Sequence, residues 1–132
     1  MSLKILSIKK AVPQKMISNE DLSKFLDTND EWILSRTGIQ NRYICTSESL
    51  VDLCEAAVIK AVKEAKIALS DIDLVICSTI CGDYLTPSLA CCVCQRINIS
   101  CPAFDINALA QALFTLWILL MDIFQLEKQK MC

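Results

Sequence analysis

The region between Ser47 and Ile67 has the clearest hydrophobic pattern in the chain. Its apolar residues recur at three- and four-residue steps, which places them along one side of a helix. The members of this stripe are Leu50, Leu53, Cys54, Ala57, Val58, Ala61, Val62 and Ala65. Lysine and glutamate residues between positions 60 and 66 fall on the other side. The pattern predicts an amphipathic helix whose apolar side packs on a core.

Two shorter helices are predicted before this one. The segment Ser18–Asp21 combines a capping serine with acidic residues in a first turn, and it predicts a helix that continues to residue 26. Polar residues at 27–30 cap a second short helix, which carries Trp32 and Arg36. Gly38 is well placed to end that helix in a left-handed conformation.

The remaining pattern alternates between strands and a helix. The predicted strands are Lys4–Ile8, Leu74–Ile80 and Pro102–Ile106, and Asn41–Ile44 is either a strand or an extended arm. The run from 74 to 80 is almost continuously apolar, which is typical of a strand buried on both faces of a parallel sheet. Pro87-Ser88 opens a further helix from Leu89 to about Ile97, with Pro87 suited to its first turn. Strands and helices in this order predict an α/β layered domain.

Composition narrows the class of protein. The chain has 132 residues, 54% of them hydrophobic and 21% charged, which suits one globular domain. A net charge of -2 argues against nucleic acid as a partner. The N-terminus lacks the features of a secretion signal, so we expect a cytoplasmic location. Leu113–Phe124 is shorter than the roughly 20 residues of a membrane-spanning helix, which favours a buried helix and no membrane span.

Nine cysteines and no histidine define the thiol chemistry of the chain. Without a secretion signal, free and buried cysteines fit better than a disulfide framework. The cluster at 91–94 contains three cysteines and could suggest zinc, but the chain has no histidine to complete the usual mixed sites. We therefore predict no metal site, and a cysteine-rich metal-binding protein stays as an alternative.

Four stretches, taken together, resemble the start of β-ketoacyl-acyl carrier protein synthase III, of the thiolase superfamily. They read DTNDEWILSRTGIQNRYI from Asp27, DLVICSTI from Asp73, DYLTPSLAC from Asp83 and CPAFDINA from Cys101. These motifs come in the family's order and at its spacing. The resemblance covers residues 1–108 and corresponds to less than half of a full-length synthase. It implies the N-terminal half of the thiolase-like layered α/β fold, and a homodimer.

The resemblance also implies an activity. Enzymes of this family are acyltransferases that condense an acyl-CoA primer such as acetyl-CoA with malonyl-acyl carrier protein, which starts fatty acid synthesis. The coenzyme A thioester is a substrate, so no resident cofactor is expected. Partners implied by the resemblance are acyl-CoA, acyl carrier protein and a second copy of the chain.

By the same resemblance, four side chains contact coenzyme A: Thr28, Trp32, Arg36 and Thr37. Trp32 and Arg36 lie four residues apart and so share one side of a helix. The arginine plane can stack on the adenine and help to hold phosphate. From spacing alone, Trp32 would be read as a core aromatic and Arg36 as a surface cation. The segment Thr86-Pro87-Ser88 matches the one that reaches toward the partner's acyl pocket, or is an ordinary helix start.

The family's nucleophile is not found where the resemblance places it. That chemistry needs a cysteine thiolate at a helix N-terminus, together with an imidazole and an amide. The matching position here is Ala110, and the resemblance places the histidine and asparagine beyond residue 132. Cys91, Cys92 and Cys101 are interpreted as structural thiols. We therefore predict an inactive chain, and the sequence leaves the primer length and any remaining coenzyme A affinity open.

The segment Leu109–Cys132 does not follow the family pattern. We interpret it as an apolar tail produced by a reading-frame shift, because one restored base lets permitted codons spell ACAGFIYALDIADGYFS-x-GKAKNV. Trp117-Ile118, Met121-Asp122 and Met131-Cys132 leave no choice in that second reading, and each gives a residue the family accepts. An apolar helix that evolved in place is the other explanation. The rival function is a non-catalytic interaction module that keeps the family's dimer surface.

Overall fold

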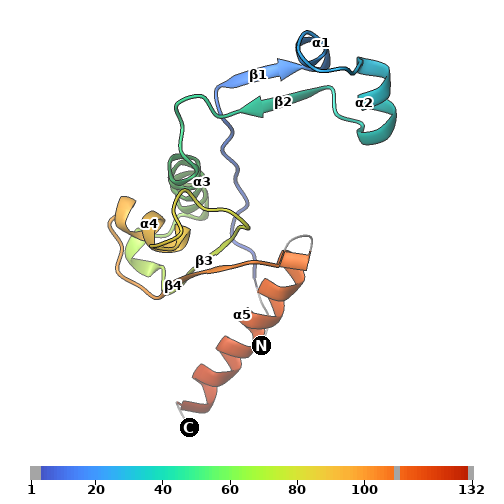
Figure 1. Ribbon diagram of the computed structural model, residues 1–132. Helices are drawn as coiled ribbons and strands as arrows, with labels where there is room; N and C mark the ends of the chain where they lie inside the picture. The colour runs from blue at the N-terminus through green and yellow to red at the C-terminus, as the bar shows by residue number, and fades with distance from the viewer. Residues whose placement is uncertain (1–3, 109–110, 131–132) are drawn as a thin grey trace.

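The computed structural model describes residues 4–108 and 111–130. Figure 1 shows two regions, an arm formed by residues 15–44 and a body formed by the elements after it. The arm contains β1 (Lys15–Ser18), α1 (Asn19–Ser23), α2 (Asp30–Thr37) and β2 (Asn41–Ile44). The body contains α3 (Leu50–Ala65), the short 3-10 helix Leu69–Asp71, β3 (Val75–Ser78), α4 (Leu89–Arg96), β4 (Ala103–Ile106) and α5 (Ala112–Lys130).

In the arm, two antiparallel strands hold two helices at their far end. β1 and β2 pair from Lys15 with Ile44 to Ser18 with Asn41. Ser18 begins α1 and forms a reciprocal capping pair with Asp21, while Asn29 accepts a hydrogen bond from the Trp32 N–H at 2.8 Å and begins α2. The predicted caps of both helices are confirmed.

Gly38 ends α2 with a φ of 70°, the left-handed conformation predicted for it. An added Cβ would meet no atom within 4 Å, so backbone conformation rather than crowding favours glycine here. α1, however, stops at Ser23, short of the expected residue 26. The prediction of a longer helix was wrong because the apolar side chains of Phe25 and Leu26 have no core to join and remain exposed.

The body is built around a parallel pair of strands. β3 and β4 pair from Val75 with Ala103 to Ser78 with Ile106, and α4 packs against both strands and against α3. The apolar core lies between α3 and α4 and consists of Val51, Leu89, Val93 and Ile97. The helix predicted from the apolar stripe is therefore confirmed as α3, which Ser49 caps. The strands predicted at 74–80 and 102–106 are confirmed with shorter bounds.

The first turns of α3 and α4 are each capped by a carboxylate that lies far away in the sequence. Asp83 accepts hydrogen bonds from the N–H groups of Leu50 and Val51, the first two residues of α3, at 3.1 and 2.9 Å. Asp105, on β4, accepts from the first two N–H groups of α4 at 2.7 and 2.8 Å. A carboxylate at these positions satisfies unpaired donors and interacts favourably with the helix dipole.

Three expectations need correction. Residues 4–8 do not form a strand; this segment instead runs along α3, where Ser7 donates to the Ala61 carbonyl at 2.8 Å and Lys9 pairs with Glu64 at 3.5 Å. A strand needs a neighbouring strand for its backbone hydrogen bonds, whereas this segment contacts α3 through its own side chains. Pro87 precedes α4 rather than lying in its first turn, because Ser88 is the capping residue. β3 is half-buried rather than buried on both faces.

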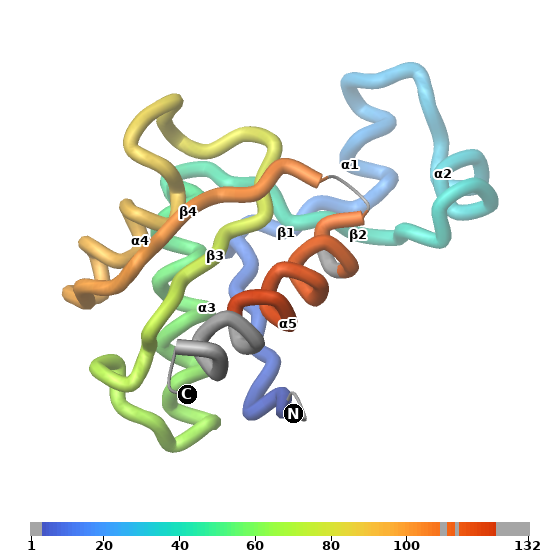
Figure 2. Tube along the Cα trace, turned by 90° about the horizontal axis from the view of Figure 1, so that it is seen from below, coloured from blue at the N-terminus to red at the C-terminus, as the bar shows by residue number. Residues whose placement is uncertain are grey.

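The last helix, α5, leaves the end of β4. Figures 1 and 2, seen from directions 90° apart, both place α5 on the opposite side of the β3–β4 pair from α3 and α4. Phe114, Trp117 and Ile118 are exposed on it, so the prediction of a buried helix was wrong for these side chains. Apolar residues occur on more sides of this helix than one two-stranded sheet can cover. None of the described helices is long and apolar enough to cross a membrane.

Candidate functional site

The outer helix of the arm presents an aromatic ring and a cation to solvent. Trp32 and Arg36 lie one turn apart on α2, and the Arg36 Cζ lies 5.0 Å from the centroid of the Trp32 ring. This distance is within the range of a cation–π contact. Trp32 keeps 54% of its surface exposed, so it is not the core aromatic that spacing alone would suggest. An aromatic base would stack on the free face of the indole or displace the guanidinium.

A cavity of about 550 Å³ opens beside this pair. Its lining residues come from the loop between α1 and α2 and from the first turns of α2: Leu26, Asp27, Thr28, Asn29, Trp32 and Ile33. The Thr28 hydroxyl is buried and finds no hydrogen-bond partner within the described part of the chain. A buried hydroxyl without a partner is costly, so this oxygen is a candidate to bind a ligand atom or a water molecule.

Thr37 has a different environment. Its hydroxyl donates to the Ile33 carbonyl at 2.7 Å and accepts from the Ile39 N–H at 3.1 Å, which closes the end of α2. The cavity is lined by Thr28 and Trp32, with Arg36 over the indole, whereas Thr37 acts on the backbone of the same helix. Sequence reasoning missed Leu26, Asp27 and Asn29 as lining residues, because it treated them as a helix end and a cap.

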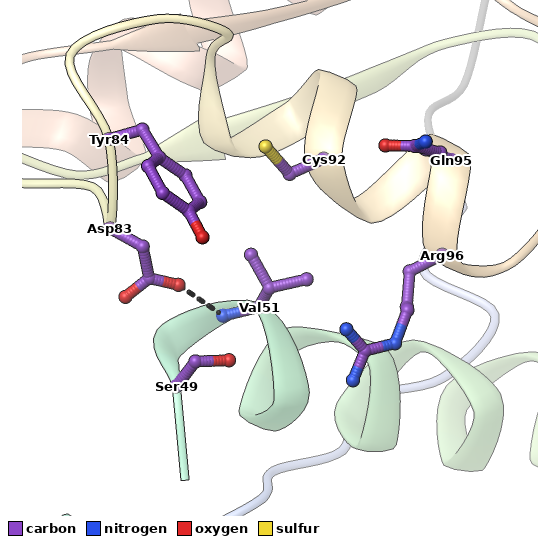
Figure 3. Close-up of a pocket in the computed structure, with 7 residues that line it drawn as sticks. All are labelled: Ser49, Val51, Asp83, Tyr84, Cys92, Gln95 and Arg96. Atoms are coloured by element: carbon purple, nitrogen blue, oxygen red, sulfur yellow. Dashed lines mark hydrogen bonds between the residues drawn. The ribbon is translucent and has the colours of Figure 1, made fainter.

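A second cavity, of about 450 Å³, lies in the body between the start of α3 and the second half of α4. Figure 3 shows its lining: Ser49, Val51, Asp83, Tyr84, Cys92, Gln95 and Arg96. Arg96 forms ion pairs with Asp52 and with Glu55, the latter at 3.0 Å between Nε and Oε2. Asp83 is likewise engaged with the start of α3. Arg96 therefore links α4 to α3, and Asp83 links the loop before α4 to the start of α3.

The described cysteines are free thiols in varied surroundings. Cys94 is buried, whereas Cys45, Cys81 and Cys91 are exposed, so the interpretation of all of them as buried was wrong for these three. Burial, followed by nearby negative charge from Cys54, Asp105 and Cys94, raises the pKa of Cys77 to about 12. Burial and the neighbouring Cys101 raise the pKa of Cys94 to about 11. Burial also raises the pKa of Cys54.

Cys91 differs from these buried thiols because it is exposed in the first turn of α4. Ala110, the position matched to the family nucleophile, lies outside the described residues. In residues 4–108 and 111–130, no three cysteine, aspartate or glutamate side chains come close enough to hold a metal ion.

Curated relatives of this chain carry the name β-ketoacyl-[acyl-carrier-protein] synthase III. The β-ketoacyl-[acyl-carrier-protein] synthase III of Clostridium acetobutylicum is 44% identical over 110 residues, which are 81% of this chain and 33% of the relative. The synthase III of Clostridium tetani is 45% identical over 107 residues, 80% of this chain and 32% of the relative. The chain thus spans about a third of the length of the curated relatives it matches. No family model matches it.

Solved structures agree with these relatives. The 3-oxoacyl-[acyl-carrier-protein] synthase III of Aquifex aeolicus superposes with a TM-score of 0.90 at 30% identity, over 96% of this chain and 42% of the solved one. The synthase III of Thermus thermophilus gives a TM-score of 0.74 at 36% identity, over 80% of this chain and 33% of the solved one.

The Aquifex match bears on the tail, because 96% of 132 residues has to extend beyond residue 108 into α5. The domain boundary at 108 and the reading-frame hypothesis stay predictions. The predicted thiolase-like α/β fold is confirmed by the solved structures. Sequence identity and fold together show that the chain belongs to the β-ketoacyl-[acyl-carrier-protein] synthase III family.

Proposed function

We propose that this chain binds the adenine nucleotide portion of an acyl-CoA at the outer end of its arm and does not transfer the acyl group by itself. The observation that carries the binding proposal is the exposed Trp32 ring with the Arg36 guanidinium 5.0 Å from its centroid, beside a cavity of about 550 Å³. Aromatic rings and arginine planes both stack on nucleobases, and the guanidinium also pairs with phosphate.

The buried Thr28 hydroxyl supports the same proposal. It lines the cavity next to Trp32 and lacks a partner among the described groups. A polar ligand atom that displaces the groups covering this oxygen would give it a hydrogen-bond partner, whereas an apolar ligand would leave it unpaired. We assign Thr28, Trp32 and Arg36 to ligand contact, and Thr37 to the stability of the helix that carries them.

The proposed lack of acyl transfer rests on thiol chemistry. Attack on a thioester requires a thiolate, and the raised pKa values of Cys54, Cys77 and Cys94 keep these thiols protonated near neutral pH. Ala110 has no nucleophilic atom. Acetyl-CoA and acyl carrier protein as substrates of the family reaction, the absence of a resident cofactor, the homodimer and a cytoplasmic location remain proposals drawn from the resemblance.

A titration of coenzyme A tests the binding proposal. The Trp117→Phe background leaves Trp32 as the one tryptophan, so its emission reports the arm. We expect Trp32→Ala to weaken binding by about tenfold or more, measured by calorimetry, because stacking of a base on an aromatic ring contributes about 1–3 kcal/mol. Phe25→Ala, which removes another exposed aromatic of the arm outside the cavity lining, is the matched control. Equal affinity in Trp32→Ala and Phe25→Ala would contradict the proposal.

Intact-protein mass analysis after incubation with acetyl-CoA tests the chemical half of the proposal. We expect no acetyl adduct. A stoichiometric adduct would overturn the inactive assignment, and Cys91→Ser would show whether the exposed thiol in the first turn of α4 had formed it.

A non-catalytic dimer is the second candidate function. The observation that favours it is the loop between β3 and α4, where Leu85 is fully exposed and Ile80 and Tyr84 are 65% and 66% exposed. Apolar side chains gathered on one exposed loop are typical of an interface. Sedimentation equilibrium of the parent chain and of Leu85→Asp tests the dimer. A parent dimer that Leu85→Asp dissociates supports this second function. A monomer in both proteins rules it out.

A further inference from the structure

The arm is held together by one buried amide. Asn19 is 1% exposed, and among the described residues it is the single polar one that is buried as a whole. Its Nδ2 donates to the Asp30 carboxylate at 2.7 Å and to the Ile39 carbonyl at 2.8 Å, and its Oδ1 accepts from the Arg42 guanidinium. Its backbone N–H donates to the Gln40 carbonyl at 3.2 Å.

These partners come from both ends of α2 and from β2. Asp30 is the first residue of α2, Ile39 directly follows the glycine that ends it, and Arg42 lies on β2. The Asn19 side chain, at the start of α1, therefore contacts both ends of α2 and also contacts β2. An amide suits this place because it offers two donors and an acceptor, so it pairs with a carboxylate, a carbonyl and one N–H group of the Arg42 guanidinium at once.

Apolar packing does little to orient the same helix. α2 buries Ile33, while Trp32 and Leu34 remain 54% and 37% exposed. A helix with so little buried surface is free to tilt or rotate unless directional contacts fix it. The hydrogen bonds of Asn19 supply that direction.

We propose that Asn19 is a positioning residue for the coenzyme A site, which fixes α2 so that the Trp32 ring and the Arg36 guanidinium face the ligand together. This inference rests on the function proposed above. Asn19 touches no ligand itself; it acts through Asp30 and the turn after α2. The role predicts that the pattern of donors and acceptors at position 19 matters, and not only its size.

Three variants in the Trp117→Phe background test that pattern. Asn19→Asp keeps the acceptor for Arg42 but loses both donors and places a second carboxylate against Asp30. Asn19→Asp combined with Asp30→Asn restores the bond to residue 30 with reversed direction, at unchanged net charge. Ser23→Ala removes an exposed hydrogen bond of α1, to the Glu20 carbonyl, and is the matched control.

Coenzyme A affinity and the fluorescence anisotropy of Trp32 are both measured. We expect Asn19→Asp to weaken binding by about tenfold and to lower the anisotropy, because unpaired buried polar groups release the helix. The double variant should recover affinity to within about threefold of the parent, while Ser23→Ala should match it. Because aspartate and asparagine have nearly the same size, a role of size alone would leave Asn19→Asp and the double variant binding like the parent. A double variant as weak as Asn19→Asp would contradict the role of the bond between residues 19 and 30.

The outcomes separate this inference from the proposed function. If Trp32→Ala loses coenzyme A affinity while Asn19→Asp keeps it, the positioning role is wrong and the binding function stands. If the parent chain binds no coenzyme A, the function is wrong, and the anisotropy alone decides: equal values in the parent and Asn19→Asp overturn the positioning role. If Asn19→Asp does not fold, Asn19→Ser replaces it, because serine keeps one donor and one acceptor. Unchanged anisotropy in Asn19→Ser would likewise contradict the positioning role.

Discussion

The arm and the body keep their folded shapes through different kinds of contact. The body buries Val51, Leu89, Val93 and Ile97 between two helices, so apolar contact holds it together. The arm buries Asn19 and Ile33, and polar contacts through caps and the Asn19 amide fix its shape. Apolar burial is strong but non-directional, whereas hydrogen bonds contribute less and specify geometry.

This difference explains how a tryptophan can remain exposed on an ordered helix. An apolar core at the end of the arm would have drawn Trp32 inward, because burying its large side chain is favourable. Polar anchors at both ends of α2 leave the indole 54% exposed and beside Arg36. The region that is built to be stable and the region that we propose to bind ligand are therefore separate.

The largest expected effect is in the body. Leu89 is 5% exposed and packs in the core, so Leu89→Ala should lower the free energy of unfolding by about 2–4 kcal/mol, from lost burial and an unfilled cavity. Urea denaturation followed by circular dichroism measures the change. Coenzyme A affinity of the folded fraction should stay within error of the parent. A weaker affinity with a normal unfolding midpoint would contradict the separation of the two regions.

A smaller loss is expected from the carboxylate that caps α4. Asp105→Ala removes both acceptors for the N–H groups of Leu89 and Ala90 and should cost about 1–2 kcal/mol in the same denaturation experiment. Asp71→Ala, which removes a local cap of the 3-10 helix at the Ala68 N–H, is the control for loss of a carboxylate. Similar small changes in both variants would show that the cap from β4 contributes no more than a local one.

The smallest effect should appear as a pH dependence where the arm joins α3. The backbone N–H of Gln14, followed by that of Thr46, lowers the pKa of Glu48 to about 2. A lowered pKa stabilises the fold above the ordinary glutamate value of 4.5, and that contribution is lost as the pH falls toward 2.

Glu48→Gln tests this contribution. The variant should be slightly less stable than the parent at neutral pH, and its unfolding midpoint should change less between pH 4.5 and 2. Thermal unfolding across that range is the measurement, with Glu31→Gln on α2 as the control. Parallel pH curves for the parent and Glu48→Gln would contradict the assignment.

Local signals predicted the elements well. Short stretches of sequence encode the caps at Ser18 and Asn29 and the left-handed Gly38, so these helix boundaries could be predicted without any partner. Strand pairing depends on distant neighbours. That is why Lys15–Ser18 was missed as a strand and residues 4–8 were wrongly predicted to be one.

The site was predictable in part for the same reason. Trp32 and Arg36 share a helix side through local spacing, and the structure brings them together. The partners of Asn19 lie 11, 20 and 23 residues away, and no local pattern indicates them. Its position directly after a capping serine suggested an ordinary first turn, which hid a buried amide that joins three elements.

Hydrogen–deuterium exchange with and without coenzyme A tests the separation of arm and body most directly. The binding proposal predicts slower exchange confined to α2 and the loop at 26–29, with α3 and α4 unchanged. Slower exchange at the start of α3 and in the second half of α4, around the cavity lined by Tyr84 and Arg96, would contradict it and place the ligand in the body.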